Sequence, residues 1–198
     1  MAIKKTTPER LTAFSDAVFA VIITIMVLDL KPPEEATLTA LFPLWPTALS
    51  YAVSYLFIAI IWVNHHHLIG FTHEATPRLI WWNFAHLFMI SLVPAATAWM
   101  AETRLAAVPV FIYALVFVFV EIAYIAFEQT AFSQARDVEL TPRLRKGARL
   151  RCYMALGMFI GAAALSFWSP QVGLALVCCV LLIYLNPRMP DWFHGSAH

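Results

Sequence analysis

Charged residues are scarce in this chain. Asp, Glu, Lys and Arg make up 13% of its 198 residues, whereas an average soluble domain has about 25%. Apolar residues make up 61%, well above the usual level of about 45–50%. A soluble fold has too little interior for so many apolar side chains, so the composition predicts an all-α integral membrane protein in a lipid bilayer. The formal net charge of +1 gives no reason to expect a nucleic-acid partner.

Cysteine is also rare, and its placement excludes two kinds of site. The three cysteines, Cys152, Cys178 and Cys179, lie within or beside apolar stretches. They have neither the paired spacing of a disulfide framework nor that of a metal-ligand set. We interpret them as packing residues, and the sequence predicts no metal site and no cofactor.

Long apolar stretches are what the sequence does have. A helix needs about 20 mostly apolar residues to cross a hydrocarbon layer of about 30 Å. Six stretches are candidates, the last of them short, and together they predict one transmembrane domain over residues 1–198 with little outside it. The predicted spans are Leu11–Leu30, Trp45–Ile69, Arg78–Met100, Ala106–Phe127, Arg149–Trp168 and Val172–Leu185.

The distribution of basic residues predicts the orientation of these spans. With a cytoplasmic N-terminus, only Lys31 and Arg104 of the 13 Lys and Arg residues fall outside. Since cytoplasmic loops carry the excess of Lys and Arg, both termini are expected in the cytoplasm of a cell with the chain in its inner or plasma membrane. The eleven inside residues are Lys4, Lys5, Arg10, Arg78, Arg136, Arg143, Arg145, Lys146, Arg149, Arg151 and Arg188.

A repeated dipeptide agrees with this orientation. Thr7-Pro8, Thr76-Pro77 and Thr141-Pro142 each fall at or before the start of an odd-numbered span, on the predicted cytoplasmic side. Thr caps helix N-termini, and Pro suits the first helical position because its missing N–H would be unpaired there anyway. The three pairs therefore predict helix starts, and the polar stretch before residue 149 is expected to extend the fifth span or to lie on the membrane surface.

Polar residues inside the spans gather at one depth. Counting 1.5 Å per residue places them in the cytoplasmic half, and almost no charge is left in the outer half. Two interpretations remain open, since such groups either pair with one another and lock helices together or line an ion path. The set comprises Arg10, Ser15, Asp16, Trp62, Asn64, His65, His66, His67, Asn83, His86 and Glu121.

Two further functions are compatible with these residues. A proton-coupled transporter could use Glu121, His86 and Asp16 as a relay, although no inverted repeat or pair of broken helices is visible. An intramembrane enzyme could use a His-rich metal site formed by residues 65–67, His73 and His86. Consecutive helical residues point about 100° apart, so three adjacent His cannot bind one ion from one helix face. We expect no enzyme.

The first span has two lines of side chains. Ala13, Ala17, Ala20 and Thr24 form a small-residue ridge that lets another helix approach closely. Val21, Thr24 and Leu28 form a narrow stripe through the middle and outer half of the bilayer. Spacing alone makes this stripe lipid-facing or part of a helix-packing core.

The start of the first span resembles a known signature. Arg10-Leu-Thr-Ala-Phe14-Ser15-Asp16 is similar to the motif of the transmembrane protein 175 family of potassium channels, an Arg followed after three residues by Phe-Ser-Asp. The similarity continues through AVFAVIITIMVLDL, through Trp62 and Asn64-His65-His66, and to Asn83 and Pro94. It is detailed in the first half of the chain and limited to the helix pattern in the second.

The resemblance implies a homotetramer of six-helix subunits in which helix 1 lines a central, potassium-permeable pore. It implies that side chains, not backbone carbonyls, narrow this pore, and the sequence has no TVGYG-like segment. By position the rings are Val21, Thr24 and Leu28. Family members commonly have Ile or Leu where this chain has the smaller Val21, which predicts a slightly wider constriction.

The resemblance also assigns roles to the polar layer. Arg10, Ser15 and Asp16 are expected to hold helix 1 at the angle that sets the aperture, with Arg10 as the partner of Asp16. The residues that share this positioning role are Phe14, Trp62, Asn64, His65 and Asn83.

Overall fold

The computed structural model describes residues 7–135 and 140–185, and these form helices without a single strand. The basic residues Lys4, Lys5, Arg136 and Arg188 and both chain termini, on which part of the orientation prediction rests, lie outside the described residues. The helices are α1 (Pro8–Leu28), the 3-10 helix η1 (Leu38–Leu44), α2 (Trp45–Ile69), α3 (Pro77–Ser91), α4 (Val93–Glu102), α5 (Ala107–Phe132), α6 (Pro142–Ser166) and α7 (Pro170–Leu185).

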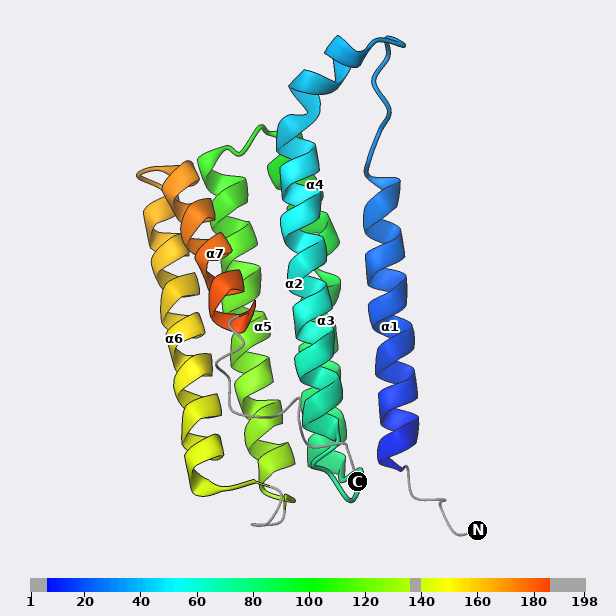
Figure 1. The fold of residues 1–198 in the computed structure, drawn as a ribbon, viewed down its shortest axis with the longest axis vertical. Helices are drawn as coiled ribbons and strands as arrows, with labels where there is room; N and C mark the ends of the chain where they lie inside the picture. Colours follow the sequence, from blue (N-terminus) through cyan, green and yellow to red (C-terminus); the bar gives the residue numbers. More distant parts are fainter. Residues whose placement is uncertain (1–6, 136–139, 186–198) are drawn as a thin grey trace.

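The helices form an up-and-down bundle, with α3 and α4 acting as one broken span (Figure 1). Five segments are long and apolar enough to cross a membrane: α1, η1 with α2, α3 with α4, α5 and α6. The sixth, α7, has 16 residues and is about 24 Å long at 1.5 Å per residue. The prediction of an all-α membrane protein with six spans, the last one short, is confirmed. We call the end at which α1, α3 and α6 begin the inner end.

All three Thr-Pro pairs start helices, as predicted. Pro8, Pro77 and Pro142 are the first residues of α1, α3 and α6. The hydroxyls of Thr76 and Thr141 accept hydrogen bonds from backbone N–H groups of the first turn, at 3.3 and 3.4 Å. These bonds satisfy donors that a helix start leaves without an intrahelical partner.

The third predicted span is interrupted. α3 ends at Ser91 and α4 begins at Val93, so the span that we expected as one helix from Arg78 to Met100 has a break at Leu92. Pro94 explains the break, because it has no N–H to donate one turn back and its ring crowds the preceding turn. The fifth predicted membrane span starts at Arg149, and the helix α6 begins about two turns earlier at Pro142, in agreement with the predicted Thr141-Pro142 start and the expected extension of this span.

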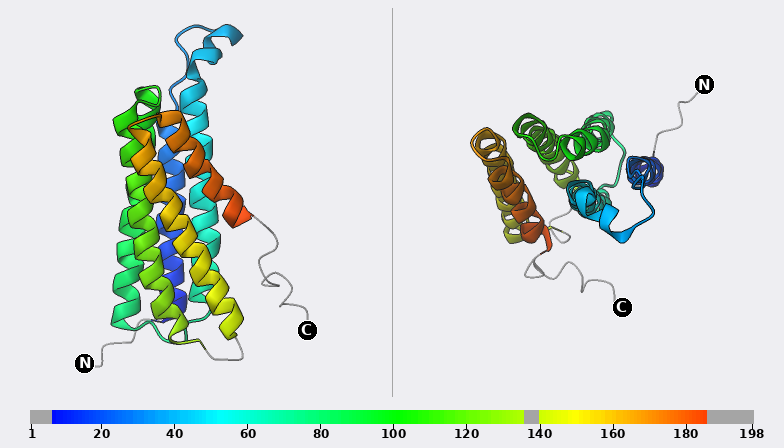
Figure 2. Two further views of the ribbon diagram at one scale, coloured as in Figure 1. Left: turned by 90° about the vertical axis from the view of Figure 1, so that its left-hand side faces the viewer. Right: turned by 90° about the horizontal axis from the view of Figure 1, so that it is seen from above.

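Burial is uneven across the bundle. α5 packs against α2, α3, α4, α6 and α7 and lies in the middle, whereas α1 packs against α2, α3 and α4 and stands at one edge (Figure 2). The side chains of α5 that face its neighbours are fully enclosed, Tyr113, Phe117 and Phe127 among them. α6 and α7 lie on the side of the bundle away from α1.

Candidate functional site

One face of α1 is anchored in the subunit. Leu11, Ser15, Phe19, Ile22 and Met26 are its buried residues. They recur every three or four residues, so they form one stripe of the helix, and this stripe faces α2 and α3. The anchoring face therefore combines apolar packing with one polar residue, Ser15.

The opposite face of α1 contains the predicted constriction residues. Val21 is 55% exposed and Leu28 is 77% exposed, and Thr24 between them is exposed as well. The ridge residues Ala17 and Ala20 share this open face. None of these side chains is needed to pack the subunit itself, so the whole predicted stripe is available to a second molecule or to an ion route.

The Thr24 hydroxyl has a defined orientation. Its Oγ1 donates to backbone carbonyls of its own helix, with Ala20 O at 3.0 Å and Val21 O at 2.9 Å. Since the proton is directed to the helix, the oxygen lone pairs remain available on the exposed side. A hydroxyl held in this way presents an acceptor, which is the property that a cation requires.

An open groove runs beside this face. It has a volume of about 640 Å³ and lies between α1 and the broken span, with Val21, Ile25, Pro94 and Ala98 among its lining residues. Its walls are formed by apolar side chains apart from Asp29 and Ser91. The break between α3 and α4 thus lies opposite the middle of α1.

A buried hydrogen-bond network joins three helices at the inner half of α1. Asn83 of α3 accepts a bond of 2.6 Å from His65 Nε2 of α2, and its Nδ2 donates to Ser15 Oγ at 3.1 Å. The Ser15 hydroxyl donates to Leu11 O at 2.9 Å. All three side chains have no exposed surface. The predicted residues Ser15, His65 and Asn83 are therefore brought together, in an interior where buried polar groups need partners.

The partner of Asp16 differs from our expectation. Its Oδ1 accepts a hydrogen bond of 2.8 Å from the indole Nε1 of Trp62. Arg10, which we expected as its partner, is exposed and forms no ion pair with it in the described residues. Six residues separate Arg10 from Asp16, which is not the three- or four-residue spacing that makes helix neighbours. Asp16 thus ties α1 to α2, not to its own first turn.

Two other motif residues have separate roles in the packing. Phe14 is 48% exposed and contacts Phe84 of α3 edge to face, with 5.3 Å between the ring centroids. Asn64 does not join the network, because its Nδ2 donates to Ile60 O of its own helix at 2.8 Å. The structure therefore separates Asn64 from the Ser15, His65 and Asn83 network with which we grouped it.

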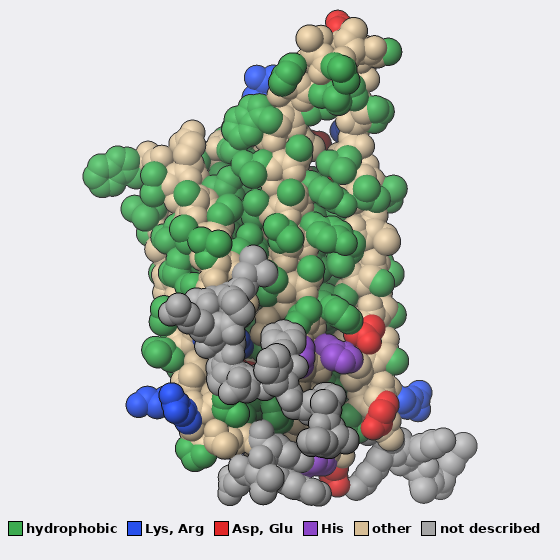
Figure 3. Space-filling view, viewed as in Figure 1, with side chains coloured by type: hydrophobic (Ala, Val, Ile, Leu, Met, Phe, Trp, Pro, Cys, Tyr) green, Lys and Arg blue, Asp and Glu red, His purple; other side chains and the backbone are tan. Residues whose placement is uncertain are grey.

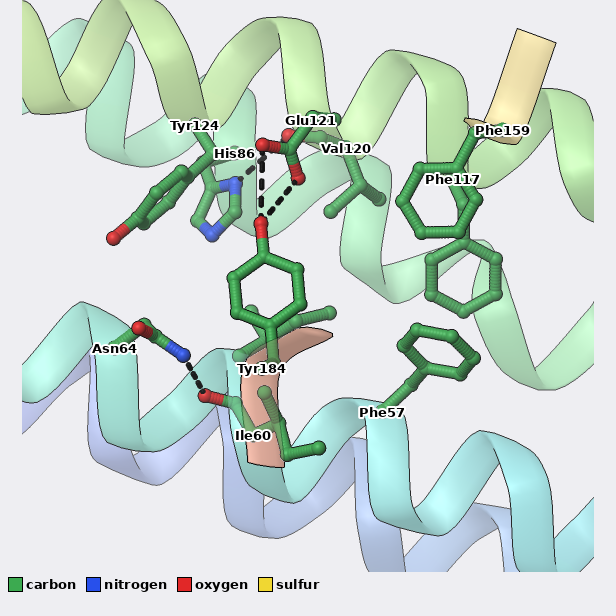
Figure 4. Close-up of a pocket in the computed structure, with 11 residues that line it drawn as sticks. Phe57, Ile60, Asn64, His86, Phe117, Val120, Glu121, Tyr124, Phe159 and Tyr184 are labelled. Atoms are coloured by element: carbon green, nitrogen blue, oxygen red, sulfur yellow. Dashed lines mark hydrogen bonds between the residues drawn. The ribbon is translucent and has the colours of Figure 1, made fainter. Parts of the chain in front are cut away.

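A small cavity lies between α2, α3, α5, α6 and α7 (Figure 4). Its volume is about 20 Å³, and its lining includes Asn64, His86, Glu121 and Tyr184. This is enough room for about one water molecule. The Tyr184 hydroxyl donates to both carboxyl oxygens of Glu121 at 3.1 Å. His86 Nδ1 donates to Val120 O at 3.3 Å, and its buried Nε2 has no protein partner.

Aromatic rings close this cavity toward the outer end. Phe57, Phe117 and Phe159 pack with ring centroids 4.5 to 5.9 Å apart. One turn further out, the Ser54 hydroxyl is hydrogen-bonded to Thr97 at 2.7 Å and to Tyr113 at 2.8 Å. The aromatic cluster therefore separates an inner polar pocket from an outer hydroxyl cluster within the subunit.

Sequence reasoning missed these last two features. The partner of Glu121 is Tyr184, and the outer cluster depends on Tyr113. The available signal was that a Tyr in a buried apolar helix usually finds a partner for its hydroxyl. That signal identifies the residue, but it does not identify the partner.

The surface agrees with a concentration of ionisable groups at the inner end. In the face drawn in Figure 3, basic, acidic and histidine side chains lie mainly in its inner part, and the middle is apolar. The outer end has a smaller set of exposed charged residues, which includes Glu34, Glu35 and the ion pair of Lys31 with Glu102 at 3.6 Å. The predicted polar layer in one half of the bundle is present.

The two competing functions can be compared with this geometry. Glu121 and His86 share the cavity, but Asp16 lies on α1 with Trp62 as its partner, so the three residues of the suggested relay are not assembled. The described residues contain no group of three or more His, Cys, Asp or Glu side chains placed to hold a metal ion. The suggested His-rich metal site thus finds no support in the described part of the chain.

Sequence comparisons identify relatives along most of the chain. It is 34% identical over 182 residues to a potassium channel of Chryseobacterium sp. (strain P1-3), covering 91% of this chain and 94% of that protein. It is 31% identical over 194 residues to a potassium channel of Chamaesiphon minutus, covering 90% and 93%. An endosomal/lysosomal proton channel of Danio rerio is 26% identical over 207 residues, which are 91% of this chain and 40% of that one.

Structural comparison also identifies a similar protein along most of the chain. The crystal structure of a lysosomal potassium-selective channel TMEM175 homolog from Chamaesiphon minutus superposes with a TM-score of 0.78 at 26% identity, covering 89% of this chain and 95% of that one. Residues 10–94, which include the Arg10 to Asp16 motif, nearly all of α1 and the buried network, match the family described as the endosomal/lysosomal potassium channel TMEM175. With relatives above 30% identity along nearly their whole length, the chain belongs to the TMEM175 family.

Proposed function

We propose that this protein is a potassium-preferring cation leak channel, and that four copies surround a pore lined by α1. The observation that supports this most is the open face of α1, where Val21, Thr24 and Leu28 are exposed while the other face is anchored by buried groups. The bacterial and cyanobacterial relatives named potassium channels support the choice of ion.

Narrowing by side chains follows from the chemistry of this stripe. Rings of Val21 and Leu28 are apolar, so a narrow ring excludes water and ions until α1 tilts or moves outward. Between them, four Thr24 hydroxyls would offer acceptor oxygens to a partly dehydrated cation, because each hydroxyl proton is already donated to the helix backbone. The pore then needs no carbonyl filter.

The polar anchors set the position of α1 in this scheme. Ser15, Asn83 and His65 hold its inner half against α2 and α3, and Asp16 with Trp62 adds a second tie. Charge-assisted and buried hydrogen bonds are directional, so they fix the rotation of the helix as well as its depth. That rotation decides which side chains face the axis.

The same proposal includes the location. The positive-inside rule places the inner end, with the start of α6 and its basic residues, in the cytoplasm of a cell whose inner or plasma membrane holds the protein. The relay of a proton-coupled carrier remains the second candidate, but the separation of Asp16 from Glu121 and His86 speaks against it.

Bilayer recording of the purified protein under bi-ionic potassium and sodium tests the function. Single-channel steps with a potassium preference are expected, whereas saturable, proton-coupled uptake would replace the channel by the carrier. Val21→Ala and Leu28→Asn should raise both potassium and sodium flux and reduce discrimination, because they widen or wet the constriction.

A matched control is Val172→Ala, which shortens an exposed side chain of α7 on the side of the subunit away from α1. It should leave flux and selectivity unchanged. If both α1 variants also conducted like the wild type, α1 would not line the route.

A further inference from the structure

The inner end of α6 holds an excess of positive charge on a surface that faces outward. α6 has five basic residues in its first ten positions, Arg143, Arg145, Lys146, Arg149 and Arg151. Arg143, Lys146 and Arg149 are exposed. Figure 3 shows Lys and Arg side chains at this end of α6.

The other two basic residues have different surroundings. An Arg145 guanidinium nitrogen donates to Phe132 O at 3.1 Å, across the connection from α5. The Arg151 guanidinium lies over the ring of Tyr184, 5.1 Å from its centroid, in the interior of the bundle. The three exposed residues are therefore a separate group, which we call the α6 patch.

The α6 patch is continuous with an apolar stripe. Lys146, Arg149 and Tyr153 are three and four residues apart, so they lie on one face of the helix. Leu150 and Ile160 lie on the same face and are 59% and 53% exposed. On the side of a membrane-spanning bundle away from α1, such an apolar stripe is placed to contact lipid chains, and the cations lie at the level where that stripe reaches the membrane surface.

The position of α6 keeps this face open. α6 lies on the side of the bundle away from α1 (Figure 2). If α1 lines a central pore, α6 is at the outer rim of the assembly. The distance from Arg149 to Ile160 is about 16 Å at 1.5 Å per residue, which is about the thickness of one leaflet of a hydrocarbon layer of about 30 Å.

We propose that the α6 patch binds the headgroup of an anionic phospholipid in the inner leaflet, while the chains of that lipid lie along Leu150, Tyr153 and Ile160. Charge complementarity selects the headgroup, because Lys and Arg side chains near a membrane attract anionic lipids. The long side chains can reach the phosphate while their methylene groups stay on the apolar stripe. The adjoining apolar stripe favours a lipid over a soluble anion.

Native mass spectrometry of the purified full-length protein tests this directly. Association constants are measured for added phosphatidylglycerol and for phosphatidylcholine. The variant K146Q/R149Q removes two charges of the α6 patch, and K31Q/R104Q removes two exposed charges at the opposite end. We expect a preference for phosphatidylglycerol that falls by about five-fold per removed charge in the first variant and is unchanged in the control.

Three results would overturn the proposal: equal binding of both lipids by the wild type, an unchanged preference in K146Q/R149Q, or an equal loss in K31Q/R104Q. Competition by millimolar inorganic phosphate would assign the patch to a soluble anion instead. If K146Q/R149Q does not fold, the wild type at rising ionic strength replaces it, since only the charged lipid should be lost as salt increases. None of these measurements involves ion flux, so their failure is distinct from a failure of the proposed channel function.

Discussion

α1 and α5 are both long, strongly apolar helices, but α1 lies at the edge of the bundle and α5 lies in its middle. In the most apolar stretch of each, 28% of the residues of α1 and 61% of those of α5 are buried. α5 is surrounded by neighbours and holds the enclosed Glu121, whereas α1 touches the bundle along one face only. Hydropathy thus identifies a membrane span without telling whether the span serves the subunit core or remains free for assembly.

The contrast extends to how each helix uses its polar residues. On α5, Glu121 is paired within the subunit by Tyr184. On α1, Ser15 and Asp16 hold the inner half against α3 and α2. The hydroxyl of the exposed Thr24 donates its proton to a backbone carbonyl of its own helix. α1 is therefore held to the bundle by its inner half and by one face, and its exposed face is suited to contact molecules outside the subunit.

The largest effect should come from truncating matched aromatic residues on the two helices. Phe117→Ala removes an enclosed ring of α5 that packs on Phe57 and Phe159, and Phe→Ala in cores costs about 3–5 kcal/mol. Phe14→Ala removes a half-exposed ring of α1 and should cost below about 1 kcal/mol. Chemical or thermal unfolding in detergent measures the free energy of unfolding of both variants. Equal losses would show that the two helices contribute equally to the stability of the subunit.

The next effect concerns the anchor of α1. Asn83→Leu leaves the buried groups of His65 and Ser15 without their shared partner, at a cost of about 1–3 kcal/mol. The same substitution at Asn64, whose amide bonds only its own helix, should cost less. Unfolding measurements compare the two variants. A smaller loss for Asn83→Leu than for Asn64→Leu would show that the network does not hold α1.

A smaller effect tests the tightly packed side of the molecule. A Cβ at Gly173 of α7 would collide with Ser166 Oγ and approach Ala162 O to 3.0 Å, so Gly173→Ala should destabilise by about 1–2 kcal/mol. At Gly157 nothing lies within 4 Å of the added Cβ, and Gly157→Ala should be neutral or stabilising by up to about 1 kcal/mol. Melting temperatures that move in the same direction would contradict the close approach of α6 and α7.

The smallest effect is the coupling between Asp16 and Trp62. In a double-mutant cycle with Asp16→Asn and Trp62→Phe, we expect a coupling energy of about 0.5–1.5 kcal/mol from the hydrogen bond between them. The cycle of Asp16→Asn with Arg10→Gln should give a value near zero. A larger coupling to Arg10 than to Trp62 would restore the pairing that the sequence led us to expect.

These results show which parts of the molecule could be predicted from sequence. The spans, the Thr-Pro starts and the half of the bundle that holds the polar residues follow from composition, capping and a fixed rise per residue. Depth along a helix does not determine rotation about it, so the partner of Asp16 and the separation of Asn64 from His65 required the structure. The start of α6 follows from the Thr141-Pro142 pair, although the basic residues of its first ten positions hide it from a search for apolar runs.

The break at Leu92 shows a related limit. Pro94 was recognised as part of the family resemblance, yet a proline in a membrane span is compatible with either a bend or a full interruption. The exposure of Val21 and Leu28 was likewise not decided by spacing, which indicated either a lipid-facing stripe or a packing core. The neighbours of α1 in three dimensions show that this face is left exposed by the subunit.

The ring cluster of Phe57, Phe117 and Phe159 affects how an ion could move through the subunit. It is an apolar barrier, since the water-sized space beside Glu121 and the hydroxyls around Ser54 lie on opposite sides of it. Over the described residues, a lone subunit therefore has no continuous polar path through its own interior. The tetramer proposed above puts the ion route between the copies, so current should disappear when the copies are driven apart.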